Sequence, residues 1–243
     1  MEALASQLQQ QFQNSSAPAI LAHFLTIYGN RIALASSLGA EDQVLTDLVL
    51  KMNPVARIFT LDTGRLPQET YAAMTETMGK YNMHYEIYCP RTEALEEMER
   101  DFGPDLFYES VASRKRCCQV RKVEPLQRVL RTLDIWITGL RREQAITRTG
   151  LQTIEWDETN GLLKLNPLAD WTTEEVWDYI KTNNVPYNQL HDQGYPSIGC
   201  SPCTKRVAPG EDIRSGRWWW EAPEHKECGL HFRDGKLVRR SCG

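Results

Sequence analysis

The chain of 243 residues lacks several features that would define its class at once. It has no apolar run approaching the roughly 18 residues that a membrane-spanning helix needs. Residues Met1–Gln7 lack the basic and apolar regions of a secretory signal, and the chain has no collagen period, long heptad array or low-complexity tract. We therefore expect a cytoplasmic protein that has no membrane partner.

Composition and charge indicate a folded chain with one unusual region. Hydrophobic residues make up 41% of the sequence and charged residues 25%, as in globular proteins, and the formal net charge is -4. Residues 114–148 nevertheless contain ten Lys and Arg against three Asp and Glu. A basic region in an acidic chain favours a bound anion, and we expect no nucleic acid, which usually requires a basic domain. A solvated basic helix face would explain the same charges.

Cysteine is frequent for a chain without an export signal. The seven cysteines are Cys89, Cys117, Cys118, Cys200, Cys203, Cys228 and Cys242. A reducing cytosol disfavours structural disulfides, so metal binding or thiol chemistry is the expected use of these residues. Because the count is odd, at least one thiol stays unpaired.

Short apolar segments alternate with helix-length segments along most of the chain. The expected strands are Arg31–Ser36, Val55–Leu61, His84–Tyr88, Ile135–Thr138 and Leu162–Leu165. Two helices are expected within residues 1–30, and others over Asp42–Met52, Gln68–Tyr81, Thr92–Arg100, Ser113–Leu133 and after the capping box of Thr172 and Glu175. This alternation predicts an α/β fold with a doubly wound, mostly parallel sheet. We expect a nucleotide-binding domain over residues 1–190, with a loop-rich segment of residues 191–243 docked on it.

Three polar loops that contain glycine follow expected strands, at the edge where ligands bind to parallel sheets. They are Ser36–Asp42, Leu61–Leu66 and Gly139–Arg148. The first lets backbone N–H groups approach an anion but lacks the Lys-Ser/Thr pair of a Walker loop. One such loop alone is more often an ordinary strand–helix turn, whereas the three together predict a nucleotide site. The candidate binding residues in them are Ser36, Ser37, Leu38, Gly39, Asp62, Thr63, Gly64, Gly139, Arg141 and Arg148.

Four cysteines form two pairs with the spacing of metal ligands. Cys117 and Cys118 are adjacent, and Cys200 and Cys203 form a Cys-x-x-Cys motif. Four thiolates suit zinc or an iron–sulfur cluster. Adjacent cysteines reach one zinc only with strain but can reach two iron atoms of a cluster, although a zinc knot or unligated thiols remain alternatives. The neighbouring cations Arg114, Arg116, Arg121 and Lys122 would stabilise an anionic cluster, while Cys89 and Cys242 fall outside the pattern and are read as incidental.

Cys228 is a candidate nucleophile, because Lys226 and His231 flank it and cationic neighbours lower the pKa of a thiol. A cysteine near a histidine is by itself usually unremarkable. Arg214 and Arg217 precede it and are candidate oxyanion ligands, although an arginine alone is more often a surface charge. The run Trp218–Trp220 would form a lid, a surface for docking a reductant, or simple packing against the body.

The three loops carry a family resemblance. Ser-Ser-Leu-Gly-Ala-Glu-Asp (residues 36–42), Leu-Asp-Thr-Gly-Arg-Leu (61–66) and Gly-Leu-Arg-Arg-Glu-Gln (139–144) together resemble the adenylyl-sulfate and phosphoadenylyl-sulfate reductase family, over about residues 30 to 235. The resemblance implies the adenine nucleotide α-hydrolase-like fold that ATP pyrophosphatases share. Those enzymes carry a Ser-Gly-Gly-x-Asp-Ser type of loop, and the different Ala40-Glu41-Asp42 segment argues against ATP cleavage.

The two cysteine pairs are similar to those of the adenylyl-sulfate reductase branch of that family. The resemblance implies a 4Fe–4S cluster on Cys117, Cys118, Cys200 and Cys203, with Lys122 between cluster and substrate. The segment Glu227–His231 resembles the catalytic motif, which implies catalytic roles for Cys228 and His231. The implied reaction is attack of the Cys228 thiolate on the sulfur of adenylyl sulfate, loss of AMP, and release of sulfite from S-sulfocysteine by a separate thioredoxin or glutaredoxin.

Other functions compatible with the residues differ in substrate or class. The nearest one is reduction of 3′-phosphoadenylyl sulfate, alone or in addition. An adenylating or sulfur-transferring enzyme of the ATP pyrophosphatase type is a second, and a metal-stabilised nucleotide-binding regulator is a third. A homo-oligomer is compatible with each.

Overall fold

The computed structural model describes residues 1–144 and 150–222, which are built around one six-stranded sheet. The strand order is β3-β2-β1-β4-β6-β5. The strands are β1 (Ile32–Ala35), β2 (Arg57–Leu61), β3 (Glu86–Tyr88), β4 (Ile135–Ile137), β5 (Ile154–Asp157) and β6 (Leu162–Leu165). All neighbouring strands are parallel except β5 and β6. The predicted α/β fold with a doubly wound, mostly parallel sheet is confirmed.

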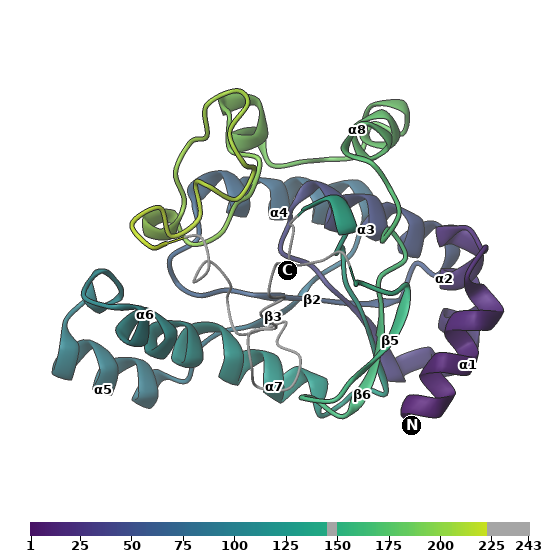
Figure 1. Ribbon diagram of the computed structural model, residues 1–243, viewed down its shortest axis with the longest axis horizontal. Coiled ribbons are helices and arrows are strands. Elements are labelled where there is room, and N and C mark those ends of the chain that lie inside the picture. The colour runs from purple at the N-terminus through teal and green to yellow at the C-terminus, as the bar shows by residue number, and fades with distance from the viewer. Residues whose placement is uncertain (145–149, 223–243) are drawn as a thin grey trace, which may run out of the picture.

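Helices cover both faces of this sheet, with α3 and α4 on one side of the strands and α7 on the other (Figure 1). They are α1 (Glu2–Phe12), α2 (Ala17–Tyr28), α3 (Ala40–Met52), α4 (Gln68–Tyr81), α5 (Thr92–Phe102), α6 (Val111–Cys118), α7 (Glu124–Leu130) and α8 (Thr173–Thr182). Successive side chains of β1 point to opposite faces of the sheet and so belong to two different hydrophobic cores. Ile32 and Leu34 pack in the core under α2 and α3. Ala33 packs on the other face with Leu126 and Val129 of α7. No helix in the described part of the chain is long and apolar enough to cross a membrane.

The expected elements agree closely with the structure except at two places. The predicted capping box opens α8 as expected. The predicted helix Ser113–Leu133 is interrupted, because a π-helical turn over Gln119–Val123 separates α6 from α7. Pro125 follows this turn in the first turn of α7. Proline has no N–H to donate to the carbonyl four residues earlier, which explains the wider turn before it.

Strand β5 has no counterpart among the expected elements. It is a four-residue edge strand that pairs antiparallel with β6, and Lys164 of β6 forms an ion pair with Glu155 at 2.9 Å. A strand this short carries little periodic signal, and it forms here because β6 offers it an open edge. Beyond residue 190 the described chain contains only 3₁₀ turns and an isolated antiparallel bridge between Thr204 and Arg217, as the loss of periodicity indicated. The division into domains at residue 190 stays a prediction.

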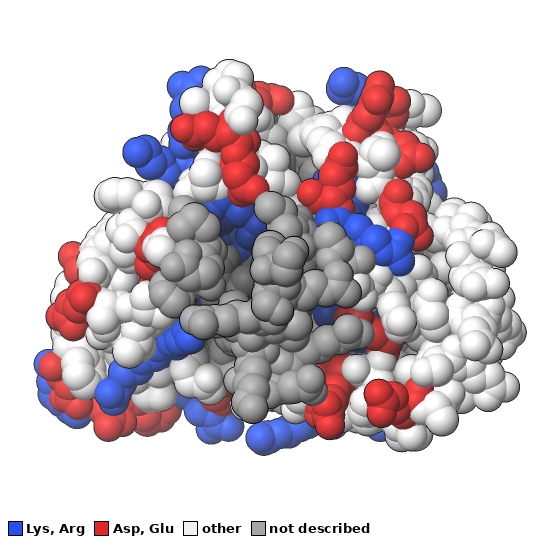
Figure 2. Space-filling view, in the orientation of Figure 1, with Lys and Arg blue, Asp and Glu red and all other residues white. Residues whose placement is uncertain are grey.

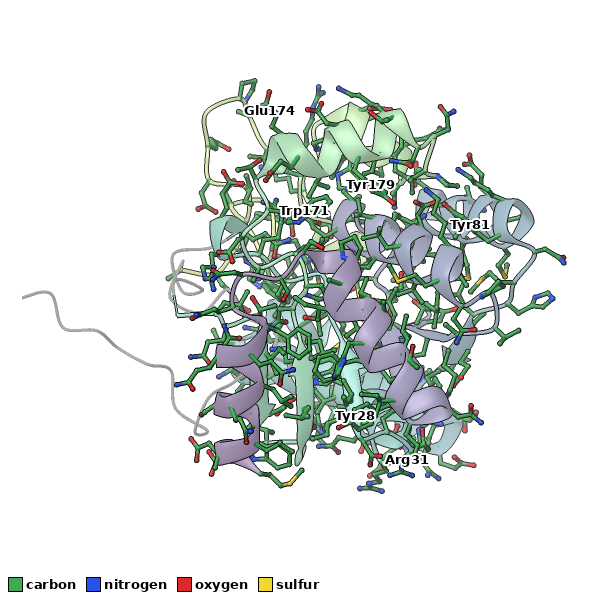
Figure 3. The ribbon with its side chains drawn as sticks, turned by 90° about the vertical axis from the view of Figure 1, so that its right-hand side faces the viewer. Tyr28, Arg31, Tyr81, Trp171, Glu174 and Tyr179 are labelled. Atoms are coloured by element: carbon green, nitrogen blue, oxygen red, sulfur yellow. The ribbon has the colours of Figure 1, made fainter. Side chains whose placement is uncertain are left out.

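Helices α3, α4 and α8 are joined through two polar residues on consecutive turns of α3. The buried Gln43 donates from Nε2 to Thr77 Oγ1 of α4 and to the Pro186 carbonyl, both at 2.7 Å. One turn later, Asp47 accepts from Tyr81 of α4 at 2.8 Å and from Tyr179 of α8 at 2.6 Å. Figure 3 shows these two tyrosines on their neighbouring helices. These bonds fix the helical layer behind the first loop, which leads directly into α3.

Replacing Gln43 by leucine is expected to lower the free energy of unfolding by about 2 kcal/mol, because the buried Pro186 carbonyl loses its donor. Denaturant unfolding followed by circular dichroism measures the change. Gln10→Leu on the exposed part of α1 is the matched control and should change stability by less than about 0.5 kcal/mol. Equal stability of the Gln43→Leu variant and the wild type would contradict this account.

Candidate functional site

The three predicted loops meet at a pocket of about 250 Å³ beyond the carboxyl ends of β1, β2 and β4. The strand order changes direction at β1, because β2 and β3 lie on one side of it and β4 lies on the other. Ligands usually bind at this point of a parallel sheet. Eight of the predicted substrate-binding residues line the pocket: Ser36, Ser37, Gly39, Thr63, Lys122, Gly139, Arg214 and Arg217. Segments about 180 positions apart in sequence are thus brought together.

The first loop is held by a carboxylate that lies inside it. Asp42 Oδ2 accepts from both the backbone N–H and the hydroxyl of Ser37, each at 2.6 Å. Burial raises the pKa of Asp42 to about 6, against the lowering effect of the Ser37 hydrogen bonds. Leu38 has a left-handed backbone with φ of 62° and a buried side chain, so it shapes the loop and contributes no side chain to the pocket lining.

The loop after β4 approaches the first loop at a glycine. A Cβ on Gly139 would lie 2.3 Å from Asp42 Oδ1 and 2.9 Å from Glu41 Cβ, so only glycine fits between them. The predicted ligand Arg141 is buried and bonded to protein instead, since its guanidinium forms ion pairs with Glu41 and Glu143, both at 2.8 Å. Arg141 therefore joins the first and third loops and is not among the residues that line the pocket.

The loop after β2 connects the pocket to the cysteines. Asp62 shapes this loop by accepting from the Gly64 N–H and the Tyr71 hydroxyl, each at 2.8 Å, and Gly64 has the φ of 71° that this turn requires. Thr63 Oγ1 lies 3.2 Å from Cys200 Sγ at hydrogen-bond distance. Thr63 and Cys200 both line the pocket, whereas Asp62 and Gly64 do not.

Three cations line the pocket, namely Lys122, Arg214 and Arg217. The buried Arg217 donates to the Ile198 carbonyl at 3.1 Å, and its guanidinium lies 4.8 Å from the centre of the Trp218 ring. A Cβ on Gly199 would lie 2.2 Å from Arg217 Nη2, so glycine leaves the space that this guanidinium occupies. Figure 2 shows Lys and Arg atoms in the middle of this face, below the yellow-green loops of Figure 1.

The four predicted metal ligands line one smaller pocket next to the first. Cys117, Cys118, Cys200 and Cys203 share it with Arg65, Arg114, Arg121 and Lys122. Burial and the neighbouring thiols Cys200, Cys118 and Cys117 raise the pKa of Cys203 to about 12. Arg116, also expected there, instead stacks on Phe102 with 4.1 Å between its guanidinium and the ring centre.

The donor set of this smaller pocket fits a group that takes four thiolates. In residues 1–144 and 150–222, no three His, Cys, Asp or Glu side chains are grouped so that they could hold a single metal ion. The four sulfurs nevertheless line one pocket. Four thiolates suit either zinc or an iron–sulfur cluster, so both interpretations of the two cysteine pairs stay open on this geometry.

A buried ion pair anchors the segment that follows the second cysteine pair. Arg114 of α6 donates to both carboxylate oxygens of Glu221, at 2.9 and 2.8 Å, and their side chains are 0% and 3% exposed. The three tryptophans before Glu221 differ in environment. Trp218 is buried beneath Arg114, Trp220 packs on Tyr108 with ring centres 4.5 Å apart, and Trp219 is 49% exposed. Simple packing against the body of the protein, one of the expected roles of this run, therefore applies to Trp218 and Trp220.

Several predicted residues lie outside the described residues, namely Arg148, Cys228, His231 and Cys242. Cys89 is an exposed free thiol apart from the cysteine pocket. Sequence reasoning did not select His191, which lines the larger pocket, and it included Asp42 in the first loop without predicting that its carboxylate holds Ser37. His191 stands in no motif and reaches the pocket only through the packing of the segment after α8.

Comparisons with known proteins agree with this geometry. The phosphoadenosine phosphosulfate reductase domain family matches residues 31–206. The adenosine 5′-phosphosulfate reductase of Allochromatium vinosum is 54% identical over 203 residues, which cover 84% of this chain and 79% of the relative. The phosphoadenylyl-sulfate reductase of Candida auris, solved with phosphate, has a TM-score of 0.73 at 28% identity and covers 85% of this chain and 98% of its own. Yeast FAD synthetase, with a TM-score of 0.53 at 14% identity, covers 84% of this chain and 75% of its own and shares the fold alone.

Gly139→Ala is expected to weaken binding of AMP by at least about tenfold, because the new methyl group displaces the Asp42 carboxylate and with it the first loop. Isothermal titration calorimetry measures the dissociation constant. Gly79→Ala in α4 is the matched control, since nothing lies within 4 Å of its Cβ position, and it should leave binding unchanged. Unaltered AMP binding by the Gly139→Ala variant would show that the close approach has no role in the pocket.

Proposed function

The chain belongs to the phosphoadenosine phosphosulfate reductase domain family, and on this premise we propose that it reduces adenosine 5′-phosphosulfate to sulfite and AMP in sulfate assimilation. The proposal rests on the relatives of that name and on one observation. The cationic part of the nucleotide pocket, with Lys122, Arg214 and Arg217, adjoins the four cysteines through Thr63 and Cys200. A dianionic phosphosulfate needs such cations, and the adjoining thiols would hold the cluster that the family resemblance implies.

The lining of the pocket supports one orientation of the substrate. The cations lie near Cys200, so they would neutralise the sulfuryl and phosphoryl oxygens. The region around Glu41, Asp42 and Gly139 carries carboxylates and would receive the uncharged nucleoside. The predicted roles of Ser36, Ser37 and Gly39 as nucleotide contacts remain part of this proposal.

The proposed reaction is a transfer of the sulfuryl group to Cys228, followed by its reduction. The Cys228 thiolate attacks the substrate sulfur, an S–S bond forms, and the S–O bond breaks with its electron pair on the departing AMP. A thiolate of thioredoxin or glutaredoxin then attacks Cys228 Sγ, and sulfite leaves with the electron pair of the S–S bond. The second thiol of the donor resolves the mixed disulfide and restores Cys228. His231 and Lys226, close in sequence, would favour the thiolate.

Cys117, Cys118, Cys200 and Cys203 are proposed to hold a 4Fe–4S cluster, because these four thiols line one pocket with four cations. Such a cluster carries negative charge and can change its oxidation state by one electron. Lys122 lines both this pocket and the substrate pocket, so it is placed to balance charge in both. A cytoplasmic location and a separate dithiol donor complete the proposal.

Cys228→Ser is expected to lower sulfite formation by at least about 100-fold, because the nucleophile is lost. With ³⁵S-labelled substrate and no reductant, the wild type should carry label on the peptide that contains residue 228. Cys242→Ser is the matched control and should keep both activity and label. Label on any other peptide would refute the assigned nucleophile. Faster sulfite formation from 3′-phosphoadenylyl sulfate would instead favour the alternative substrate, whose reductase in Candida auris is similar to this chain.

Anaerobic purification is expected to give a coloured protein with about four iron and four sulfide per chain. Cys203→Ser should lose the broad visible absorbance and most of the iron, because the buried Cys203 lies in the cysteine pocket. Cys89→Ser, at an exposed thiol outside it, should keep both. Zinc without iron in the wild type, or full iron content in Cys203→Ser, would contradict the assignment.

A further inference from the structure

His191 is placed in the nucleotide pocket by a rigid short turn. It lies in the 3₁₀ turn Gln189–Gln193, after α8. Asn188 begins this turn, accepting from the Leu190 N–H at 3.0 Å and donating to Thr70 Oγ1 of α4 at 2.9 Å. The imidazole packs edge-to-face with Trp177 of α8, with 5.3 Å between the ring centres. Backbone and ring are therefore both fixed before any ligand binds.

One nitrogen of this ring has no hydrogen-bond partner within residues 1–144 and 150–222. His191 Nε2 is buried, and the residue lines the larger pocket. Burial lowers the pKa of His191 and so favours the neutral ring, while a hydrogen bond with the Tyr195 backbone acts in the opposite direction. A hydrogen bond that raises the pKa of a histidine is one in which the ring donates, and Nε2 has no partner, so we assign the proton of the neutral ring to Nδ1. Nε2 is then left with a lone pair. A buried acceptor without a donor is unfavourable, and a ligand donor would remove that cost.

The charges around His191 indicate which part of a ligand supplies that donor. Glu41 is close enough to act on the imidazole, and Glu41 and Asp42 line the same pocket. Ionised phosphate and sulfate oxygens only accept hydrogen bonds, so they cannot satisfy a lone pair on Nε2, and the carboxylate of Asp42 repels them. Of the cations that line the pocket, Lys122 shares the smaller pocket with Cys200, and Arg217 lies against Gly199. A ligand that satisfies Nε2 must therefore offer an uncharged O–H or N–H.

We propose that His191 is a specificity-determining residue for the nucleoside, with Nε2 accepting a hydrogen bond from a ribose hydroxyl or from the adenine amino group. The inference rests on the proposed function, because it assigns the nucleoside part of that substrate to this end of the pocket. A sugar or base that lacks the donor would leave Nε2 buried and unpaired. Such an analogue would bind more weakly although it loses only one polar group.

The test is a thermodynamic cycle between the protein and the nucleotide, measured by isothermal titration calorimetry. AMP, 2′-deoxy-AMP, 3′-deoxy-AMP and purine riboside 5′-monophosphate, which lacks the amino group, are titrated into the wild type and His191→Ala. In the wild type one analogue is expected to bind about tenfold more weakly than AMP. His191→Ala should bind AMP about tenfold more weakly and no longer distinguish that analogue from AMP. The sensitive analogue identifies whether a hydroxyl or the amino group is the donor.

Two further variants separate this role from a structural one. His191→Gln, whose amide oxygen also accepts, should recover part of the discrimination. His84→Ala, at an exposed histidine outside the pocket, should match the wild type. If His191→Ala lost the same affinity for all four nucleotides, or lost affinity for none of them, the role of His191 would be overturned and the proposed function would stay intact. A wild type that binds no AMP would overturn the proposed function, and the role of His191 with it.

Discussion

The buried ion pair between Arg114 and Glu221 is the interaction on which the arrangement of the site depends. It joins α6 to a segment more than 100 residues later in the chain, with both side chains almost fully removed from water. Removing one partner of a buried ion pair leaves the other charge uncompensated and lowers the free energy of unfolding by about 3–5 kcal/mol. This is a large part of the about 5–15 kcal/mol that stabilises a typical domain. Arg217 and Trp218 lie just before Glu221, and the Trp218 N–H donates to the Cys203 carbonyl at 3.2 Å, so the pair also helps to hold Arg217 and the second cysteine pair in place.

The two pockets are parts of one unit. Lys122 and Cys200 line both, and Thr63 contacts Cys200 from the loop after β2. Charge placed among the four thiols would therefore act on the cations of the larger pocket over a short distance, in a largely buried setting where screening is weak. Of the basic residues between positions 114 and 148, Arg114, Arg121 and Lys122 line the smaller pocket, whereas Arg116 and Arg141 have other partners.

Local patterns in the sequence were sufficient to predict the sheet, the three loops and the two cysteine pairs. Parallel strands bring their carboxyl ends to one edge of the sheet. The loops that follow these strands therefore lie together there, independently of how the rest of the chain folds. The sequence did not reveal that Arg141 is bonded to Glu41, 100 positions earlier, or that Asp42 holds Ser37. Likewise, the edge strand β5 and the pocket position of His191 depend on partners that only the folded chain provides.

The π-helical turn Gln119–Val123 determines which residues of one continuous helical segment face which neighbour. Each residue of a helix advances its side chains by about 100°, so the wider turn offsets the faces before and after it. The cysteines of α6 can therefore point to one pocket while Leu126 and Val129 of α7 stay against the sheet. Deleting one residue from this turn would rotate the helix after it relative to the helix before it, so either the paired cysteines or the apolar stripe would face the wrong side.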